Sequence, residues 1–242
     1  MKVLITGANG MLGSVLSKLY KDPVLLNGRK DLDLTCSSSV KSFFINRYFD
    51  TIIHCAAYTN LNWCDDNLLD CYQLHSTIVP FLQKYCKKLI YISTNPTESK
   101  RIYYHSKRLG EEFTLLRSQD LAIRTNIYGN SGLVQWAVDS LRNKKNINGY
   151  SNVMFNPVSV YQLSNFIKKD SKSFKGIVNV SSDKVLSKYA FILEICEKLN
   201  LDKKLISSIR VNGDLDLTIP QKEAILYSHK NGIKELCKKL TL

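Results

Sequence analysis

Tyr103 and Lys107 are the two side chains of this sequence that are best suited to acid–base chemistry. They stand four residues apart in a segment predicted to be helical, so both face one side, about one turn apart. An ammonium beside a phenol favours the phenolate and lowers the pKa of the tyrosine. Such a tyrosine can give a proton to a carbonyl oxygen while hydride arrives at the carbon. Tyr104 and Arg108 repeat the spacing, but a guanidinium stays charged and cannot tune a phenol as lysine does.

Two hydroxyl side chains, Ser93 and Thr94, end the apolar stretch 89–94, which is predicted to be a strand. Successive residues of a strand point to opposite faces, so only one of the two should face the acid–base pair. We expect Thr94 to be that residue and to hydrogen-bond the carbonyl that receives the hydride.

A glycine-rich turn near the start of the chain predicts a dinucleotide site. Gly7, Gly10 and Gly13 form a G-x-x-G-x-x-G pattern directly after the apolar stretch 2–6 and before a helical pattern. Glycines let the backbone approach a pyrophosphate, and the N-terminus of the following helix offers free N–H groups and partial positive charge.

The end of the second predicted strand, 23–27, indicates which dinucleotide is bound. An acidic residue usually grips the ribose diol of NAD there, but here Arg29 and Lys30 follow. Two cations suit a 2′-phosphate, so NADPH is favoured and NADH is the alternative. Further on, Asp33 could accept a hydrogen bond from the adenine amino group while Leu34 lines the base. Alternatively, Asp33 caps the helix that starts near 36–39.

Strands and helices alternate through the first half of the chain, which predicts right-handed crossovers and a parallel sheet. The fold class is therefore α/β, a Rossmann-like doubly wound parallel sheet that binds ligands beyond the carboxyl ends of its strands. The predicted strands are 2–6, 23–27, 51–55, 89–94 and 121–124, and the helices that follow the glycine turn are 37–49, 67–86 with a bend near Pro80, and 103–118.

The pattern loosens after residue 126. Helices are predicted near 133–143, 160–170 and 187–199, and 176–180 reads as one more strand of the sheet. We therefore expect residues 1–126 to form the dinucleotide-binding domain with the catalytic residues. Residues 127–242 should add one strand and a small substrate-binding lobe.

Composition excludes several other classes of protein. The net charge is 34 − 21 = +13, but the basic residues are scattered and mostly lysine, whereas base-reading proteins rely on arginine. We therefore expect a solvated basic surface and no nucleic-acid partner. The seven cysteines are odd in number and form no CxxC, so we expect reduced thiols and no metal site. No apolar run approaches the ~20 residues of a membrane span, and no signal peptide is recognisable, so a cytoplasmic protein is expected.

Several stretches together resemble the extended short-chain dehydrogenase/reductase family, and most closely its dTDP-4-dehydrorhamnose reductases and related nucleotide-sugar 4-ketoreductases. The stretches are TGANGMLG at 6–13, GRKDLDLT at 28–35, IIHCAAYTN at 52–60, LIYISTN at 89–95, YYHSKRLGE at 103–111 and IRTNIYG at 123–129. The resemblance implies NADPH-dependent reduction of the 4-keto group of a nucleotide-linked 6-deoxyhexose. A homodimer is common in that family, but the sequence does not fix the oligomeric state.

The resemblance assigns a role to each matching position. The catalytic hydroxyl, the proton donor and the supporting lysine fall on Thr94, Tyr103 and Lys107, and Lys107 also holds the nicotinamide ribose. The substrate is implied to contact Thr94, Asn95, Tyr103 and Asn126. The residues implied at the cofactor diphosphate are Gly7, Gly10, Met11, Leu12 and Gly13, and those at the adenosine and ribose are Ala56, Ala57 and Tyr58.

Three departures from the family pattern leave alternatives open. Only eight residues separate Thr94 from Tyr103, where the family has a longer segment beside the sugar, and the chain is short overall. His75 stands where the family tends to place an asparagine linked to the proton relay, so it either relays protons itself or is packed. The alternatives are a combined epimerase and reductase, with Cys64, His75 or His105 as extra acid–base groups, and a cofactor-binding regulatory subunit.

Overall fold

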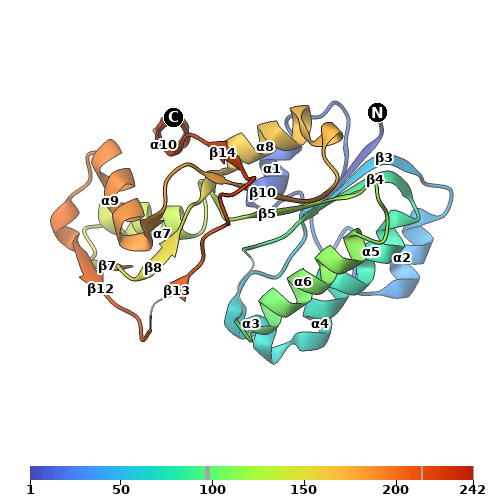
Figure 1. Ribbon diagram of the computed structural model, residues 1–242, viewed down its shortest axis with the longest axis horizontal. Coiled ribbons are helices and arrows are strands. Elements are labelled where there is room, and N and C mark those ends of the chain that lie inside the picture. Colours follow the sequence, from blue (N-terminus) through green and yellow to red (C-terminus); the bar gives the residue numbers. More distant parts are fainter. Residues whose placement is uncertain (96–98, 214, 242) are drawn as a thin grey trace. The chain divides into compact units, whose positions relative to one another are not determined.

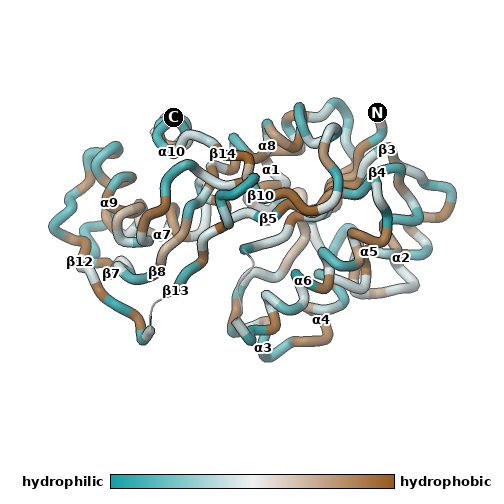
Figure 2. Tube along the Cα trace, in the orientation of Figure 1, coloured by the Kyte–Doolittle hydropathy of each residue, from teal (hydrophilic) through white to brown (hydrophobic). Residues whose placement is uncertain are grey.

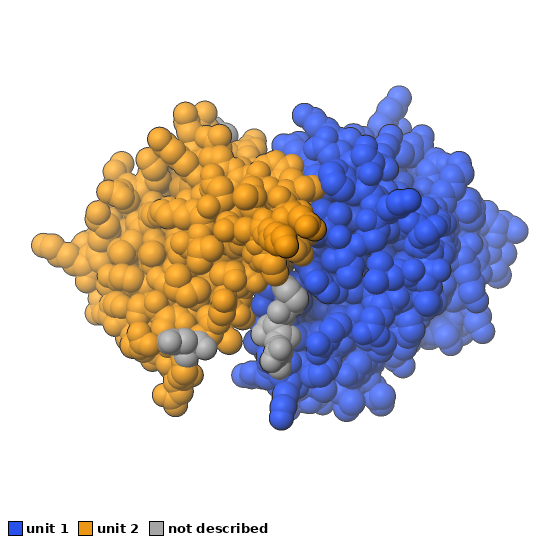
Figure 3. All heavy atoms as spheres, viewed as in Figure 1, with its two compact units in different colours: residues 1–124, 164–178 blue, residues 125–163, 179–242 orange. Residues whose placement is uncertain are grey.

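The computed structural model describes residues 1–95, 99–213 and 215–241. The chain divides into two compact units, which Figure 3 colours separately. Unit 1 contains residues 1–124 and 164–178, and unit 2 contains residues 125–163 and 179–242. The expected domains were contiguous, whereas here the segment 164–178 returns to the first unit.

A seven-stranded sheet confirms the predicted doubly wound architecture. The pairs of neighbouring strands whose register is described are all parallel, and Leu4 lies beside Ile52 as Thr6 lies beside His54. All four residues of the first strand are buried, as expected for a strand covered on both faces. The strand order is β14-β10-β5-β4-β3-β1-β2, with β1 (Val3–Thr6), β2 (Val24–Leu26), β3 (Phe49–His54), β4 (Cys86–Ile92), β5 (Leu121–Thr125), β10 (Gly176–Ser182) and β14 (Ile225–Tyr227).

Helices cover both faces of this sheet (Figure 1). One face carries α1 (Met11–Leu16) and α8 (Val160–Lys169), and a 3₁₀ turn (Ser171–Ser173) follows α8. The helices on the other face are α2 (Ser37–Phe44), α3 (Leu61–Asp66), α4 (Leu68–Tyr72), a π-helix (Gln73–Thr77), α5 (Ile78–Gln83) and α6 (Ile102–Thr114).

The predicted helix 67–86 consists of three consecutive pieces, which are α4, a π-helix and α5. The irregularity was expected near Pro80, but the structure places it one turn earlier, as the π-helix at Gln73–Thr77. Proline lacks an N–H and its ring crowds the carbonyl four residues before it, here that of Ser76. The turn before a proline therefore widens, and widened turns of this kind are frequent at functional sites. The π-helix contains His75.

One core of unit 1 lies between the sheet and the helices α2, α5 and α6. Phe44 is fully buried and packs edge-on against Phe49 and Phe81, with ring centroids 6.1 and 5.7 Å away. Tyr91 is the largest fully buried side chain. Figure 2 shows the strands near the middle of the sheet mostly in brown, whereas α5 and α6 alternate between brown and teal. This alternation is typical of helices with one buried face.

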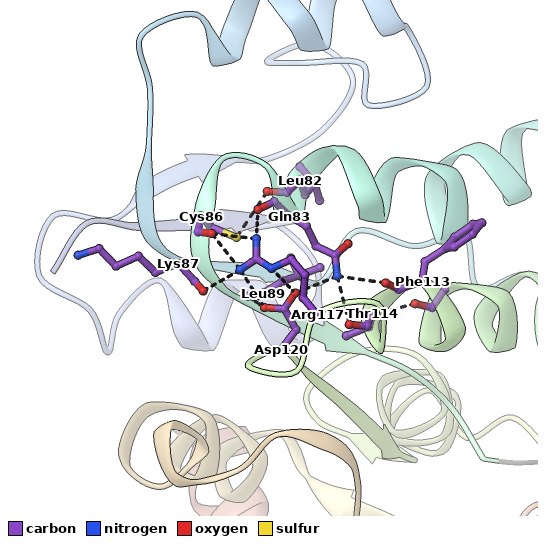
Figure 4. A network of polar contacts seen from close by, with 10 residues as sticks. Leu82, Gln83, Cys86, Lys87, Leu89, Phe113, Thr114, Arg117 and Asp120 are labelled. Carbon is purple, nitrogen blue, oxygen red and sulfur yellow. Dashed lines mark hydrogen bonds and ion pairs between the residues drawn. The ribbon is translucent and has the colours of Figure 1, made fainter.

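A buried polar network fastens the end of α6 to the start of β4 (Figure 4). Asp120 accepts hydrogen bonds from the backbone N–H of Leu89 and from the side-chain amide of Gln83, each at 2.8 Å. Arg117 donates to the carbonyl of Cys86 at 3.1 Å. Burial raises the pKa of Asp120. The network fixes α6, the helix that carries Tyr103, relative to the sheet.

Unit 2 has its own core, in which Phe191 packs against Tyr128 and Phe155 with ring centroids 5.0 and 5.3 Å away. The predicted helices near 133–143 and 187–199 are present as α7 (Leu133–Arg142) and α9 (Lys188–Lys198). The unit also contains a 3₁₀ turn (Lys203–Leu205), α10 (His229–Leu240), the pair β6 (Ile127–Tyr128) and β9 (Val158–Ser159), the pair β7 (Ile147–Tyr150) and β12 (Ile206–Ile209), and the small sheet of β11 (Leu186–Ser187), β8 (Val153–Phe155) and β13 (Leu215–Asp216).

All seven cysteines are free thiols. Within the described residues, no helix has the length and apolar character needed to cross a bilayer.

Gly110 lets α6 pack closely against the π-helix, and replacing it should destabilise unit 1. A Cβ at this position would lie 2.3 Å from the carbonyl oxygen of His75 and 2.3 Å from Tyr91 Oη. We expect Gly110→Ala to lower the free energy of unfolding by about 1–3 kcal/mol, as overpacking of a core does. Urea denaturation followed by circular dichroism measures this. Gly28→Ala is the control, since a Cβ there meets nothing within 4 Å, and equal stability of the two variants would contradict the packing argument.

Candidate active site

Tyr103 and Thr94 meet at the carboxyl end of β4. Tyr103 lies in the first turn of α6, and its hydroxyl is hydrogen-bonded to that of Thr94, which follows β4. Thr94 also donates to Asn95 Oδ1 at 3.1 Å. The ring of Tyr103 lies edge-on to that of Tyr104, with centroids 5.1 Å apart. The structure thus brings three of the predicted residues together, while residues 96–98 of the short segment that joins β4 to α6 lie outside the described residues.

Lys107 is buried one turn further along α6. Its ammonium donates to the carbonyl of Ile92 at 2.5 Å and lies over the ring of Tyr91, 4.2 Å from the centroid. Burial lowers the pKa of Lys107 to about 7, an effect that Glu111 and Cys55 oppose. The amine therefore loses its charge much more readily than an exposed lysine does.

The pKa of Tyr103 is raised, not lowered as the spacing to Lys107 predicted. Burial raises it to about 12, although the hydrogen bond with Thr94 acts in the opposite direction. Burial of the phenol therefore dominates, while the ammonium of Lys107 donates to Ile92 and lies over the ring of Tyr91. A phenol with this pKa keeps its proton at neutral pH, which is the form a proton donor needs.

His75 is fully buried between the loop after β3 and α6. Its Nε2 accepts a hydrogen bond from the backbone N–H of Tyr58 at 2.9 Å, and its Nδ1 lies 2.8 Å from the hydroxyl of Ser106. Burial, with Lys107 and His54 nearby, lowers the pKa of His75 to about 2. The ring is therefore neutral, and since Nε2 is an acceptor, its proton is on Nδ1. Of the two sequence-based alternatives, this arrangement favours packing.

A second buried histidine connects the strand ends to the π-helix. His54, the last residue of β3, contacts Thr6 Oγ1 at 2.8 Å through Nδ1 and the carbonyl of Leu74 at 2.9 Å through Nε2. Thr6 also accepts a hydrogen bond from the backbone N–H of Ala56 at 3.2 Å. Burial lowers the pKa of His54 to about 4. These bonds fix the start of the loop 56–58 beside the glycine turn.

The glycine turn packs closely on this loop. Gly7 has a positive φ of 63°, and a Cβ there would lie 2.8 Å from the backbone of Ala56. At Gly13 a Cβ would lie 2.2 Å from the carbonyl oxygen of Gly7. A side chain at either position would therefore force the turn apart. Gly10, Met11 and Leu12 lie between them, where the turn passes into α1.

A pocket with a volume of about 270 Å³ opens beside this turn and lies within unit 1. Of the predicted cofactor residues, seven line it: Gly7, Arg29, Asp33, Leu34, Ala56, Ala57 and Tyr58. Complete small-molecule sites usually measure about 300–1,000 Å³, so this pocket would hold only part of a dinucleotide.

The two cations after β2 are placed differently from each other. Arg29 lines the pocket, donates to Asp70 Oδ2 at 2.6 Å and lies over the ring of Tyr58, 5.5 Å from the centroid. The hydrogen bond with Asp70 raises the pKa of Arg29. Lys30 is exposed and does not belong to the described lining of the pocket. Arg29 is thus the better placed of the two to meet a phosphate.

Asp33 lines the pocket, but its Oδ1 is already engaged. It accepts hydrogen bonds from the backbone N–H and the hydroxyl of Thr35, at 2.9 and 2.6 Å. Burial raises the pKa of Asp33, but these bonds and Arg29 outweigh it and leave the pKa lowered. The carboxylate therefore fixes the turn before α2 and does not cap that helix in the described structure. Its contact with adenine stays a prediction.

Asn126, the other predicted substrate residue, belongs to unit 2. Its side-chain amide donates to the carbonyl of Leu217 at 2.5 Å, and its own carbonyl accepts from the backbone N–H of Val158 at 2.8 Å. In this structure the residue therefore ties strand segments of unit 2 together, and its role toward a substrate stays a prediction.

The other proposed acid–base groups differ in position. Cys64 is buried near Tyr103 and Cys71, and burial raises the pKa of its thiol. His105 is partly exposed on α6, with Nδ1 3.4 Å from an Arg108 nitrogen. A thiol with a raised pKa is a poor base at neutral pH, so the position of Cys64 does not favour an additional acid–base pair.

Sequence reasoning missed the partners that hold the candidate catalytic groups. Ser106 lies between Tyr103 and Lys107 in the sequence, and its position three residues after Tyr103 is the one signal that places it on the same helix face. Tyr91 sits in a plain strand pattern with nothing to pair it with His75. The further residues that line the pocket are Asn9, Leu26, Asn27, Gly28, Leu32, Thr35 and Leu74.

Comparisons with known proteins agree with the predicted family. The model of the family described as "RmlD substrate binding domain" matches residues 1–214. The spore coat polysaccharide biosynthesis protein SpsK of Bacillus subtilis is 27% identical over 232 residues, covering 85% of this chain and 82% of that protein.

Solved structures share the fold along the whole chain. A dTDP-4-dehydrorhamnose reductase of Clostridium acetobutylicum superimposes with a TM-score of 0.87 at 22% identity, covering 100% of both chains. A dTDP-4-dehydrorhamnose reductase of Bacillus anthracis, solved in complex with NADP, gives 0.85 at 23% identity and covers 98% of this chain and 99% of its own. The predicted Rossmann-like fold and the predicted family are confirmed.

The buried amine of Lys107 should make stability depend on pH. Its pKa is about 7 in the folded protein and near 10.5 when exposed. Between these values the unfolded chain binds more protons, so Lys107 makes the free energy of unfolding rise with pH. In urea denaturation, wild type should therefore gain stability relative to Lys107→Met between about pH 7 and about pH 10.

Lys87→Met is the matched control. Lys87 is exposed, and its hydrogen bond with Asp50 raises its pKa. The contribution of Lys87 to the free energy of unfolding should therefore stay constant over the same pH range. This contribution begins to be lost only when the pH rises above the ordinary pKa of lysine. A difference between wild type and Lys107→Met that does not change with pH would contradict the burial of a titrating amine.

Proposed function

This chain belongs to the family described as the RmlD substrate binding domain, and we propose that it is an NADPH-dependent reductase of nucleotide sugars. Its substrate is a nucleotide-linked 6-deoxyhexose, and the group that is reduced is the 4-keto group. The names of two similar structures support the reaction, since both are dTDP-4-dehydrorhamnose reductases. The relative in Bacillus subtilis, a polysaccharide biosynthesis protein, supports a role in making sugar precursors.

The observation that carries this proposal is the placement of Tyr103. Its hydroxyl keeps its proton, meets the hydroxyl of Thr94 at the carboxyl end of β4, and lies on the helix that carries Lys107. The carboxyl ends of the strands are where doubly wound sheets bind their ligands. The pocket lined by Gly7 and Tyr58 belongs to the same unit.

The residues of the pocket fit a phosphorylated dinucleotide. Gly7 and Gly13 have no side chain that could keep a diphosphate away from the backbone of the turn. Arg29 provides a guanidinium for a 2′-phosphate, and apolar side chains such as Leu34 suit an adenine ring. The Bacillus anthracis structure was solved with NADP, which supports the same cofactor here.

In the proposed reaction NADPH supplies the hydride, and this chain orients the carbonyl and supplies the proton. Thr94 and Tyr103 hydrogen-bond the 4-keto oxygen, so negative charge that develops there is stabilised in place. Tyr103 then donates its proton to this oxygen. Lys107, one turn further along α6, would hold the nicotinamide ribose. Positioning of the reacting groups contributes further to the rate enhancement.

Replacement of the phenolic hydroxyl tests the proton donor. In a screen of keto-sugar nucleotides followed by NADPH absorbance, Tyr103→Phe should lower kcat by about 10²–10⁴-fold, the usual contribution of a general acid. The dissociation constant for NADPH should stay close to that of wild type. Tyr104→Phe is the matched control and should retain turnover. Near-normal turnover by Tyr103→Phe, or loss of turnover by Tyr104→Phe, would contradict the assignment.

Arg29→Ala tests the choice of cofactor. Charged hydrogen bonds to a phosphate are strong, so this change should weaken NADPH binding by about tenfold or more and leave NADH binding almost unchanged. Lys30→Ala should have a smaller effect, since Lys30 lies outside the described lining. Fluorescence titration with both cofactors measures the constants. Equal loss of NADPH and NADH affinity in Arg29→Ala would refute recognition of the 2′-phosphate.

A further inference from the structure

We propose that His75 is a positioning residue that joins the cofactor loop 56–58 to the helix carrying Tyr103 and Lys107. In this role it stays a single neutral tautomer and passes no proton. The inference rests on the proposed function for its meaning in catalysis, but its geometry is independent of that function. It resolves the two roles that the sequence left open for this histidine.

The first link runs from His75 to the cofactor loop. Nε2 accepts a hydrogen bond at 2.9 Å from the backbone N–H of Tyr58, which lines the pocket beside Gly7 and lies under the guanidinium of Arg29. The rings of Tyr58 and His75 also lie near each other, with centroids 6.1 Å apart. Without this acceptor the buried amide would be unpaired, so the loop would lose its fixed position.

The second link runs from His75 to α6. Nδ1–H donates to Ser106 Oγ at 2.8 Å, and that hydroxyl donates to the carbonyl of Tyr103 at 3.0 Å. The imidazole also lies edge-on to the ring of Tyr103, with centroids 5.8 Å apart and planes at 88°. The histidine therefore restrains the phenol through both the backbone and the ring.

The third link fixes the backbone of His75 itself. Its carbonyl accepts a hydrogen bond from Tyr91 Oη at 2.7 Å, and Tyr91 Oη also donates to the carbonyl of Lys107 at 3.3 Å. The tyrosine stands on β4, so strand, π-helix and α6 share one hydroxyl. The widened turn before Pro80 contains the residue that makes these contacts.

A proton relay needs one ring nitrogen to take a proton while the other releases one. Here Nε2 is held by a backbone N–H, which cannot accept or pass on a proton in return. The titratable and charged groups around the ring are Lys107 on α6, His54 on β3 and the phenols of Tyr58, Tyr91 and Tyr103. Lys107 and His54 both disfavour a positive charge on His75.

NMR of the ¹⁵N-histidine-labelled protein tests the tautomer directly. We expect the ring nitrogens of His75 to show a protonated Nδ1 and an unprotonated Nε2 throughout the pH range in which the protein stays folded. The four histidines of the chain are assigned by single substitution. Titration of His75 within that range, or the Nε2–H tautomer, would overturn the proposal.

Variants separate the two ring links. The amide oxygen of Gln reaches the place of Nε2, so His75→Gln keeps an acceptor for Tyr58, whereas Asn reaches only the place of Nδ1. We expect His75→Leu and His75→Asn to weaken NADPH binding by about tenfold, and His75→Gln to stay within about threefold of wild type. If His75→Leu does not fold, the Gln and Asn variants decide. Weaker NADPH binding by His75→Gln than by His75→Asn would overturn the proposal.

Ser106→Ala tests the link to α6, and Ser76→Ala is the matched control. Ser76 is the next residue of the π-helix, and its hydroxyl donates to the carbonyl of Tyr72, within the same helical stretch. We expect Ser106→Ala to lower kcat by about tenfold with the NADPH constant and the pH profile of kcat unchanged, and Ser76→Ala to alter none of these. Wild-type kcat in Ser106→Ala, or an altered pH profile, would overturn the positioning role.

Failure of the proposed function gives a different pattern of results. A wild-type protein that binds NADPH but reduces no keto-sugar nucleotide would contradict the reaction. The tautomer of His75 and the ranking of the His75 variants by their dissociation constants for NADPH would still decide the positioning role, because neither measurement needs turnover.

Discussion

The buried imidazole of His75 must have both of its nitrogens hydrogen-bonded, and this requirement links the two halves of the candidate active site. An unpaired polar group in a protein interior costs free energy, so a neutral ring without charge compensation is stable only with a donor on one side and an acceptor on the other. The backbone N–H of Tyr58 and the hydroxyl of Ser106 provide them. The cofactor loop and the catalytic helix are therefore held at one distance by one side chain.

Burial also sets the protonation states of the groups around this ring. It raises the pKa of Tyr103 to about 12 and lowers those of Lys107 and His54 to about 7 and about 4. Each shift favours the neutral form, as expected when charge is removed from water. A site of this kind holds a phenolic proton ready for transfer and carries little charge of its own. Charge that develops on a substrate oxygen would then be stabilised by the fixed hydroxyls of Thr94 and Tyr103.

The sheet and the family could be predicted from the sequence, because buried parallel strands leave continuous apolar runs and the glycine turn has a fixed place after the first of them. The π-helix could not, since the effect of Pro80 appears one turn upstream of the proline itself. The partners of His75 were also hidden, because Ser106 is 31 residues away along the chain. The expected lowering of the Tyr103 pKa by Lys107 failed because burial of the phenol dominates, and spacing on a helix does not reveal how deeply a side chain is buried.

The proposed function requires that the hydroxyls of Thr94 and Tyr103 and the glycine-lined pocket serve one hydride transfer to a sugar carbonyl. Incubation of the protein with a nucleotide-linked 4-keto-6-deoxyhexose and NADPH deuterated at nicotinamide C4, followed by NMR of the sugar product, tests this most directly. We expect deuterium at C4 of the product, and none at C3 or C5 when the same reaction is run with unlabelled NADPH in deuterated water. Product formed without deuterium at C4 from labelled NADPH, or oxidation of NADPH with no reduced sugar, would contradict it.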